Sequence, residues 1–155
     1  KAIFRYAVLT MLLFSALIYT GVFVFASQIT SIFNSENDPL LQTIAIEGLR
    51  LYFIACPFAG FNIILSMFFT SIERPRPAHG ISLLRGFFVI IPMALILSRV
   101  ATLQGVWCAF PATELLVSGI ALAFYRSWLK KENASAISLP KPLDKATVED
   151  SVSIQ

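Results

Sequence analysis

The sequence is poor in charged residues. Asp, Glu, Lys and Arg make up 14% of its 155 residues, whereas hydrophobic residues make up 57% and the mean hydropathy is +0.76. A soluble domain carries about a quarter charged residues, which it needs to cover its surface. This shortage excludes an ordinary water-soluble fold and predicts a chain whose main partner is the lipid bilayer.

Residues for metal and redox chemistry are equally scarce. His79 is the one histidine, and Cys56 and Cys108 each lie in an apolar segment without ligand-like spacing. The chain also lacks a phosphate-binding glycine loop, a zinc-protease pair and a serine close to a histidine. We therefore expect no enzyme, no metal site and no cofactor.

A formal charge of +3 does not indicate nucleic-acid binding. The basic residues stand at the ends of apolar runs rather than in a pattern that reads a groove or stacks on bases. We expect no nucleic-acid partner.

Long apolar runs dominate the sequence. At about 1.5 Å per residue, the run over 7–26 covers the roughly 30 Å hydrocarbon core of a bilayer. Further runs predict helices over 40–72, 81–100 and 105–128. The expected fold is an all-α membrane protein with four transmembrane helices in a membrane region over residues 1–129.

The connections predict the orientation. Asp38-Pro39 marks a helix start, and two prolines make 73–80 a short basic loop. In a four-helix arrangement one side of the membrane receives nearly all positive charge, a bias typical of cytoplasmic loops; its residues are Lys1, Arg5, Arg74, Arg76, Arg126, Lys130 and Lys131. Both ends of the chain are expected in the cytoplasm, and the polar tail over 130–155 is expected to be disordered.

Ionisable side chains at membrane depth are costly, so each needs an explanation. Glu47 and Arg50 are expected to pair on one helix face near the outer end of the second helix. If Arg85 lay at the interface, residues 86–98 would span only roughly 20 Å. Arg85 must then lie partly inside, either snorkelling with local thinning of the bilayer or facing inward, held by an acidic side chain or by helix-end carbonyls.

Glu114 lies near the middle of the fourth helix and is too short to snorkel, so it should face the helix bundle. It lies on a small and polar face that is suited to lining a cavity, formed by Trp107, Pro111, Glu114, Ser118, Ala121 and Tyr125. The simpler alternative is a protonated acid that makes one interhelical hydrogen bond. A second stripe on helix two, suited to close packing or to substrate access, contains Ala55, Ala59, Asn62, Ser66 and Thr70.

Prolines fall inside each of the last three predicted helices. Pro57, Pro92 and Pro111 predict one kink in each. Membrane helices tolerate such prolines because neighbouring groups satisfy the freed backbone. Repeatedly broken helices are typical of proteins that change shape during transport.

Several motifs resemble the multidrug and toxic compound extrusion (MATE) family of cation-coupled antiporters. They are the stretches 81–86 (ISLLRG), 90–92 (IIP), 105–107 (GVW) and 109–111 (AFP) followed by Glu114, preceded by 51–53 (LYF), Pro57-Phe58, Asn62 and 71–73 (SIE). The resemblance implies a two-lobed transporter of twelve helices, of which this chain is a carboxyl-terminal fragment with helices nine to twelve. Its partner is then the missing amino-terminal half.

The resemblance also implies a function. The expected activity is secondary active export of cationic or aromatic drugs in exchange for Na⁺ or H⁺, in the inner (cytoplasmic) membrane of a bacterium. The residues expected to line the pathway or change conformation are Glu114, Arg85, Asn62, Pro57, Pro92 and Pro111. Some relatives bind the cation with an acidic residue in the tenth helix, whereas this chain offers Asn62 there, so that assignment does not transfer.

Two other functions stay open. A flippase for lipid-linked oligosaccharides or peptidoglycan precursors would share the broken helices, but it favours several inward-facing basic residues for pyrophosphate. A non-transporting membrane subunit would need no polar residues in a pathway. The charge of the cargo would distinguish the flippase from the drug exporter. An upstream six-helix repeat would exclude the non-transporting subunit.

Overall fold

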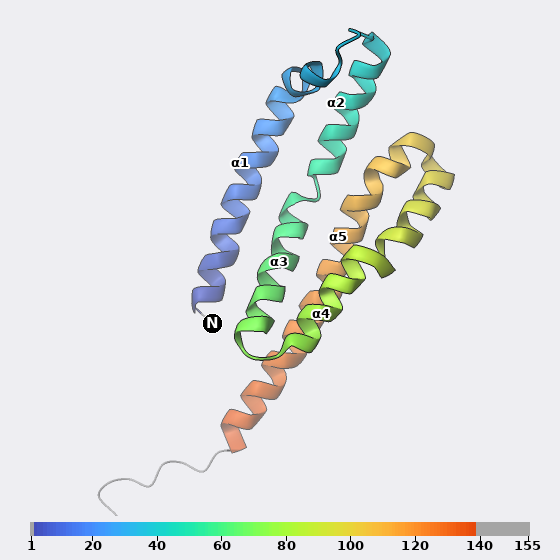
Figure 1. The fold of residues 1–155 in the computed structure, drawn as a ribbon. Coiled ribbons are helices and arrows are strands. Elements are labelled where there is room, and N and C mark those ends of the chain that lie inside the picture. The colour runs from blue at the N-terminus through green and yellow to red at the C-terminus, as the bar shows by residue number, and fades with distance from the viewer. Residues whose placement is uncertain (1, 139–155) are drawn as a thin grey trace, which may run out of the picture. The chain divides into compact units, whose positions relative to one another are not determined.

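The computed structural model describes residues 2–138, and these are helical almost throughout (Figure 1). The elements are α1 (Ala2–Phe33), α2 (Pro39–Phe53), α3 (Cys56–Ser71), α4 (Pro75–Leu83), the π-helical segment η1 (Leu84–Phe88) and α5 (Ile90–Ser138). Three continuous stretches are long and apolar enough to cross a membrane, namely Ile3–Phe33, Pro39–Ser71 and Pro75–Ala134. The all-α membrane fold predicted from the sequence is confirmed.

The third of these stretches contains two predicted helices. Its backbone leaves helical geometry at Ala101 (φ −124°, ψ 21°) and Thr102 (φ 47°, ψ −123°), and the chain turns back there (Figure 1). The segments on either side of the turn correspond to the predicted helices over 81–100 and 105–128.

The first connection is shorter than predicted, because α1 continues to Phe33. The hydroxyl of Thr30 donates to the carbonyl of Ala26 at 2.8 Å, which satisfies this polar side chain within the helix. Helix α2 begins where predicted, since Asp38 Oδ1 accepts the N–H of Leu40 at 2.8 Å. Pro39 occupies the first helical position, where its missing N–H costs nothing.

The second predicted helix is interrupted just before Pro57. Helix α2 ends at Phe53 and α3 begins at Cys56, which separates the two by Ile54 and Ala55. Proline cannot donate a backbone hydrogen bond, and in a continuous helix the ring of Pro57 would collide with the carbonyl of Phe53. The break removes that collision. Helix α1 packs along both pieces (Figure 1), so the predicted interruption is confirmed.

The predicted loop over 73–80 is wrong. Only Ile72, Glu73 and Arg74 connect α3 to α4, which begins at Pro75. Pro75 and Pro77 fall in the first turn of α4, where an N–H has no partner within the helix. The two prolines therefore start a helix rather than prevent one.

Residues 125–138 form a unit of their own at the end of α5. The rings of Tyr125 and Trp128 stack in it, with centroids 5.9 Å apart. The helix continues to Ser138, so the predicted disorder is wrong for 130–138, where leucine, lysine, glutamate and alanine favour helix. The rest of the predicted tail lies outside the described residues.

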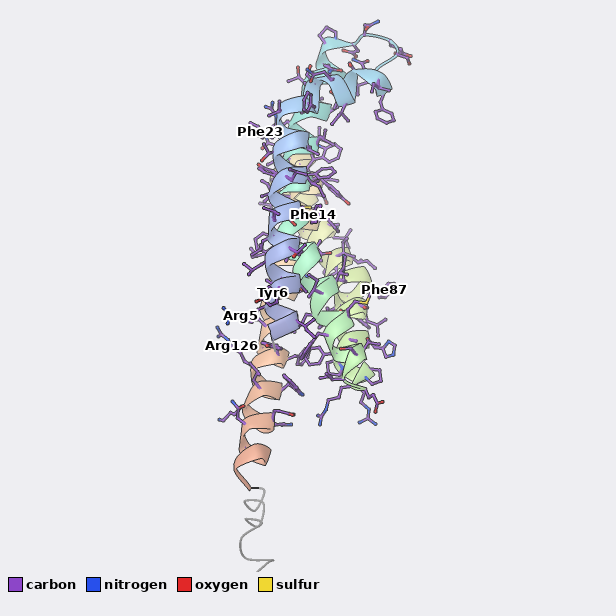
Figure 2. All side chains as sticks on the ribbon, turned by 90° about the vertical axis from the view of Figure 1, so that its left-hand side faces the viewer. Arg5, Tyr6, Phe14, Phe23, Phe87 and Arg126 are labelled. Carbon is purple, nitrogen blue, oxygen red and sulfur yellow. The ribbon has the colours of Figure 1, made fainter. Side chains whose placement is uncertain are left out.

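Large apolar side chains cover the outside of residues 2–124. Tyr6, Phe14 and Phe23 project from α1 in Figure 2, and Phe87 is exposed on η1. The buried residues are mostly small, with Leu65, Phe69 and Ile81 the largest apolar ones. A surface of this kind suits lipid or further membrane helices and not water.

Candidate functional site: a buried cluster of Arg85, Glu114 and Asn62

Glu114 lies inside the helix bundle, as the sequence predicts. Its side chain is 1% exposed. Val117 and Ala121 continue the same buried face toward the end of the helix. A carboxyl group in this position must have polar partners, because burying it alone is expensive.

Arg85 supplies the first partner. Its Nη2 lies 2.9 Å from Oε1 of Glu114, which makes the two side chains an ion pair. Of the two interpretations left open for Arg85, the contact supports the inward-facing arginine held by an acidic side chain. The Arg85 side chain is 24% exposed against 1% for Glu114, so the guanidinium is the member of the pair nearer the surface.

Asn62 supplies the second partner, from α3. Its Nδ2 donates to Oε2 of Glu114 at 2.7 Å and to the backbone carbonyl of Glu114 at 3.1 Å. Both carboxylate oxygens therefore have a donor, one cationic and one neutral. The single interhelical hydrogen bond of the simpler alternative does not describe this site, which joins α3, η1 and α5.

The amide oxygen of Asn62 is left over. It is buried and has no hydrogen-bond partner among the described residues. Buried acceptors are normally satisfied, so an unpaired one at a charged cluster calls for an explanation.

The two stripes of small and polar residues bring α3 and α5 together. Ser118 Oγ donates to the backbone carbonyl of Phe58 at 3.3 Å, and Ala55, Asn62 and Ala121 are buried. Thr70, at the far end of the helix-two stripe, is exposed. The stripe thus serves close helix packing over most of its length.

An aromatic and glycine contact fixes the other end of this interface. The rings of Tyr52 and Phe110 stack with centroids 4.6 Å apart and an interplanar angle of 10°. The indole of Trp107 covers Gly48 so closely that a Cβ there would lie 2.6 Å from its Cδ2. Sequence reasoning missed Gly48; a glycine inside an apolar helix is the signal that indicates such a close approach.

Arg85 is presented by a π-helical turn that the sequence did not reveal. In η1 the N–H of Val89 donates to the carbonyl of Leu84 at 2.9 Å, one residue further back than in an α-helix. Pro92 follows in the first turn of α5, and in a continuous α-helix its ring would collide with the carbonyl of Phe88. The wide turn removes that collision, and such turns are frequent at functional sites.

The other two predicted kinks differ from each other. The chain breaks before Pro57, whereas Pro111 lies within α5 and the helix continues through it. Pro111 lies one turn before Glu114. Because proline has no N–H, the carbonyl of Trp107 lacks its usual donor. The helix is not broken at Pro111, and a kink there stays a prediction.

Replacing Pro92 by alanine is expected to convert η1 to an α-helix. Losing the π turn rotates the residues before it by about 100° relative to α5, which moves Arg85 off Glu114. We expect the export activity proposed for the full-length protein to fall about fivefold or more, with the thermal unfolding temperature retained because alanine adds a backbone hydrogen bond. Pro111→Ala, which has no π turn beside it, is the control; equal export by both variants would contradict a role for Pro92 in placing Arg85.

Glu47 and Arg50 do not pair as predicted. Glu47 Oε1 accepts from Gln104 Nε2 at 2.8 Å. Arg50 Nη2 donates to the backbone carbonyl of Phe23 at 3.1 Å, with its guanidinium carbon 4.3 Å from the centre of the Phe23 ring. Helix α1 thus offers Arg50 a carbonyl and an aromatic ring, and these contacts replace the predicted pair with Glu47. Residue spacing within one helix does not reveal such partners.

Residues 2–138 contain no group of three or more His, Cys, Asp and Glu side chains that would hold a metal ion. The cluster itself consists of a guanidinium, a carboxylate and an amide. These groups bind and exchange charge partners.

Comparison with known proteins agrees with the fold. The sequence model of the MatE family matches residues 1–96, a range that includes Asn62 and Arg85. A protein named FAD transporter from Shewanella oneidensis is 30% identical over 114 residues, which cover 71% of this chain. The chain spans about a quarter of that relative's length, 24%. No solved structure matches the chain.

Proposed function

Because the chain belongs to the MatE family of membrane transporters and is a multi-pass membrane protein, we propose that it forms part of a secondary active efflux transporter. The transporter exports cationic or aromatic compounds in exchange for Na⁺ or H⁺. The observation that supports this most is the ion pair of Arg85 with the fully buried Glu114. A charge pair inside membrane helices is costly, and function is the usual reason for it.

The cluster joins the irregular parts of the helices. Asn62 lies on α3, which follows the break at Ile54 and Ala55, and Arg85 lies in the π-helical segment η1. A transporter needs contacts that differ between its inward-facing and outward-facing states. We propose that breaking and forming the contacts of Glu114 helps set the balance between these two states.

The same proposal includes the location of the chain. The proposed position of both chain ends in the cytoplasm is supported by the positive charge gathered on one side of the predicted helices. The bacterial inner membrane is proposed from the resemblance to the MATE family. The amino-terminal half of the transporter is the proposed partner, and drugs are the proposed cargo. Exposed apolar side chains on α1 offer a surface for those additional helices or for lipid (Figure 2).

A second candidate cargo is a flavin dinucleotide. The Shewanella relative is named FAD transporter, and FAD combines an aromatic ring system with an anionic diphosphate. In this chain Arg85 is a partly exposed cation, and Tyr52 and Phe110 form an aromatic pair. Arg85 is the one basic residue of the cluster and Glu114 already binds it, which counts against any diphosphate cargo, FAD and lipid-linked pyrophosphates alike.

Transport by the reconstituted full-length protein tests the proposal. In proteoliposomes with an imposed Na⁺ or H⁺ gradient, we expect a cationic dye such as ethidium to move against its own gradient, and an ionophore to stop it. Comparing the two gradients identifies the coupling ion. Gradient-driven movement of FAD without dye transport would favour the second candidate, and transport of neither would contradict both.

A further inference from the structure

The cluster has three side-chain oxygen atoms of the kind that a small hard cation binds. Glu114 contributes two carboxylate oxygens, and Asn62 contributes an amide oxygen that is buried without a partner. Carboxylate and amide oxygens are the ligands that hard cations prefer. The place beside Glu114 is nevertheless taken, because Arg85 Nη2 lies 2.9 Å from Oε1.

A second cation would meet strong repulsion there. Any ion bound to the Glu114 carboxylate would lie within a few ångströms of the guanidinium, and like charges repel strongly where water is excluded. A second carboxylate would be needed to balance both cations. The remaining acidic side chains of residues 2–124 lie in connections or have other partners; they are Glu36, Asp38, Glu47 and Glu73.

We propose that Arg85 is a tethered counter-ion that occupies the place of a coupling Na⁺, so that Na⁺ binds Glu114 and Asn62 only when Arg85 is removed. In the native protein this cluster then takes no metal cation. A proton can still neutralise Glu114, because it needs no coordination space. The inference rests on the ion pair; only its consequence for coupling depends on the proposed function.

Thermal unfolding of the full-length protein in detergent tests this directly. Each variant is heated in NaCl and in choline chloride at equal ionic strength. For Arg85→Ala we expect Na⁺ to raise the unfolding temperature in a saturable way by about 2 °C or more, because the ion binds only the folded state. The native protein and Arg85→Lys, which keeps the charge, should show no such difference.

The double variant Arg85→Ala with Glu114→Gln is the matched control. Like Arg85→Ala, it leaves space beside residue 114, but it has no carboxylate there. Na⁺ should therefore no longer raise its unfolding temperature. If Arg85→Ala does not fold, Arg85→Gln removes the same charge with less change in volume.

Two results would overturn the inference. One is a saturable Na⁺ effect on the native protein that Glu114→Gln abolishes, which would place the ion beside Arg85. The other is a folded Arg85→Ala or Arg85→Gln variant without any Na⁺ effect. Neither readout involves a transported compound, so a failure of the drug-export proposal would appear separately, in the proteoliposomes.

Discussion

Glu114→Gln is expected to reduce drug export about tenfold or more at equal expression, since hydrogen bonds to charged groups contribute about 1.5–3 kcal/mol and each 1.4 kcal/mol shifts an equilibrium tenfold. Glutamine has nearly the same size and still accepts a hydrogen bond from Asn62. It lacks the charge that holds Arg85 at 2.9 Å. The variant therefore changes the balance between transport states while keeping the packing of a residue that is 1% exposed.

Export is measured as efflux of a fluorescent cationic dye from cells, normalised to the amount of protein in the membrane. Ser118→Ala is the control, because Ser118 also joins α5 to α3 through its hydroxyl, at 3.3 Å from the carbonyl of Phe58, but carries no charge. We expect that control to stay within about twofold of the native protein. Native export by Glu114→Gln would remove the role assigned to Glu114.

Gly105→Ala is expected to lower the free energy of unfolding by about 1–3 kcal/mol, as overpacking of a tight contact does. Gly105 is buried at the turn between the two segments of α5, and a Cβ there would overlap the backbone carbonyl of Leu97. A carbonyl in a helix cannot move aside as a flexible side chain can. The turn at Ala101 and Thr102 must then open to accept the extra methyl group.

Gly119→Ala provides a matched control on the same helix. A Cβ at Gly119 meets no atom within 4 Å, so this variant should keep or slightly raise the unfolding temperature, since alanine favours helix over glycine. Both temperatures are measured on detergent-solubilised full-length protein. Equal stability of the two variants would show that the approach at Leu97 is not tight.

The sequence predicted the helical elements well because their signals are local. A run of apolar residues of bilayer length, a capping Asp38 and a proline in mid-helix each act within a turn or two of the chain. The errors were local as well. Pro75 and Pro77 were interpreted as helix-breaking although they begin α4, and the tail was predicted to be disordered although α5 reaches Ser138.

The site was predicted in its parts but not in its assembly. The cost of burying charge singled out Arg85 and Glu114 one by one, and a polar stripe singled out Asn62. Their contacts cross helices, and Asn62 and Glu114 are 52 positions apart in the sequence. Periodicity within a helix does not give the rotation of one helix against another. Pro92 indicated a kink, but a proline within a helix does not reveal that a π turn relieves it, and this turn sets the direction of Arg85.

The same limit explains the failure at Glu47 and Arg50. Spacing along α2 made them neighbours, whereas their partners, Gln104 and Phe23, come from other helices. Where two partners compete for a charged side chain, tertiary contacts decide.

A double-mutant cycle on Arg85 and Glu114 tests the central claim most directly, namely that the two side chains form one functional unit. Unfolding temperature and dye export are measured for the native protein, Arg85→Gln, Glu114→Gln and the double variant. Each single variant leaves a charge without its partner, so we predict that the double variant is more stable than the sum of the single effects allows, by about 0.5–3 kcal/mol of coupling. Strictly additive effects on both stability and export would contradict the account.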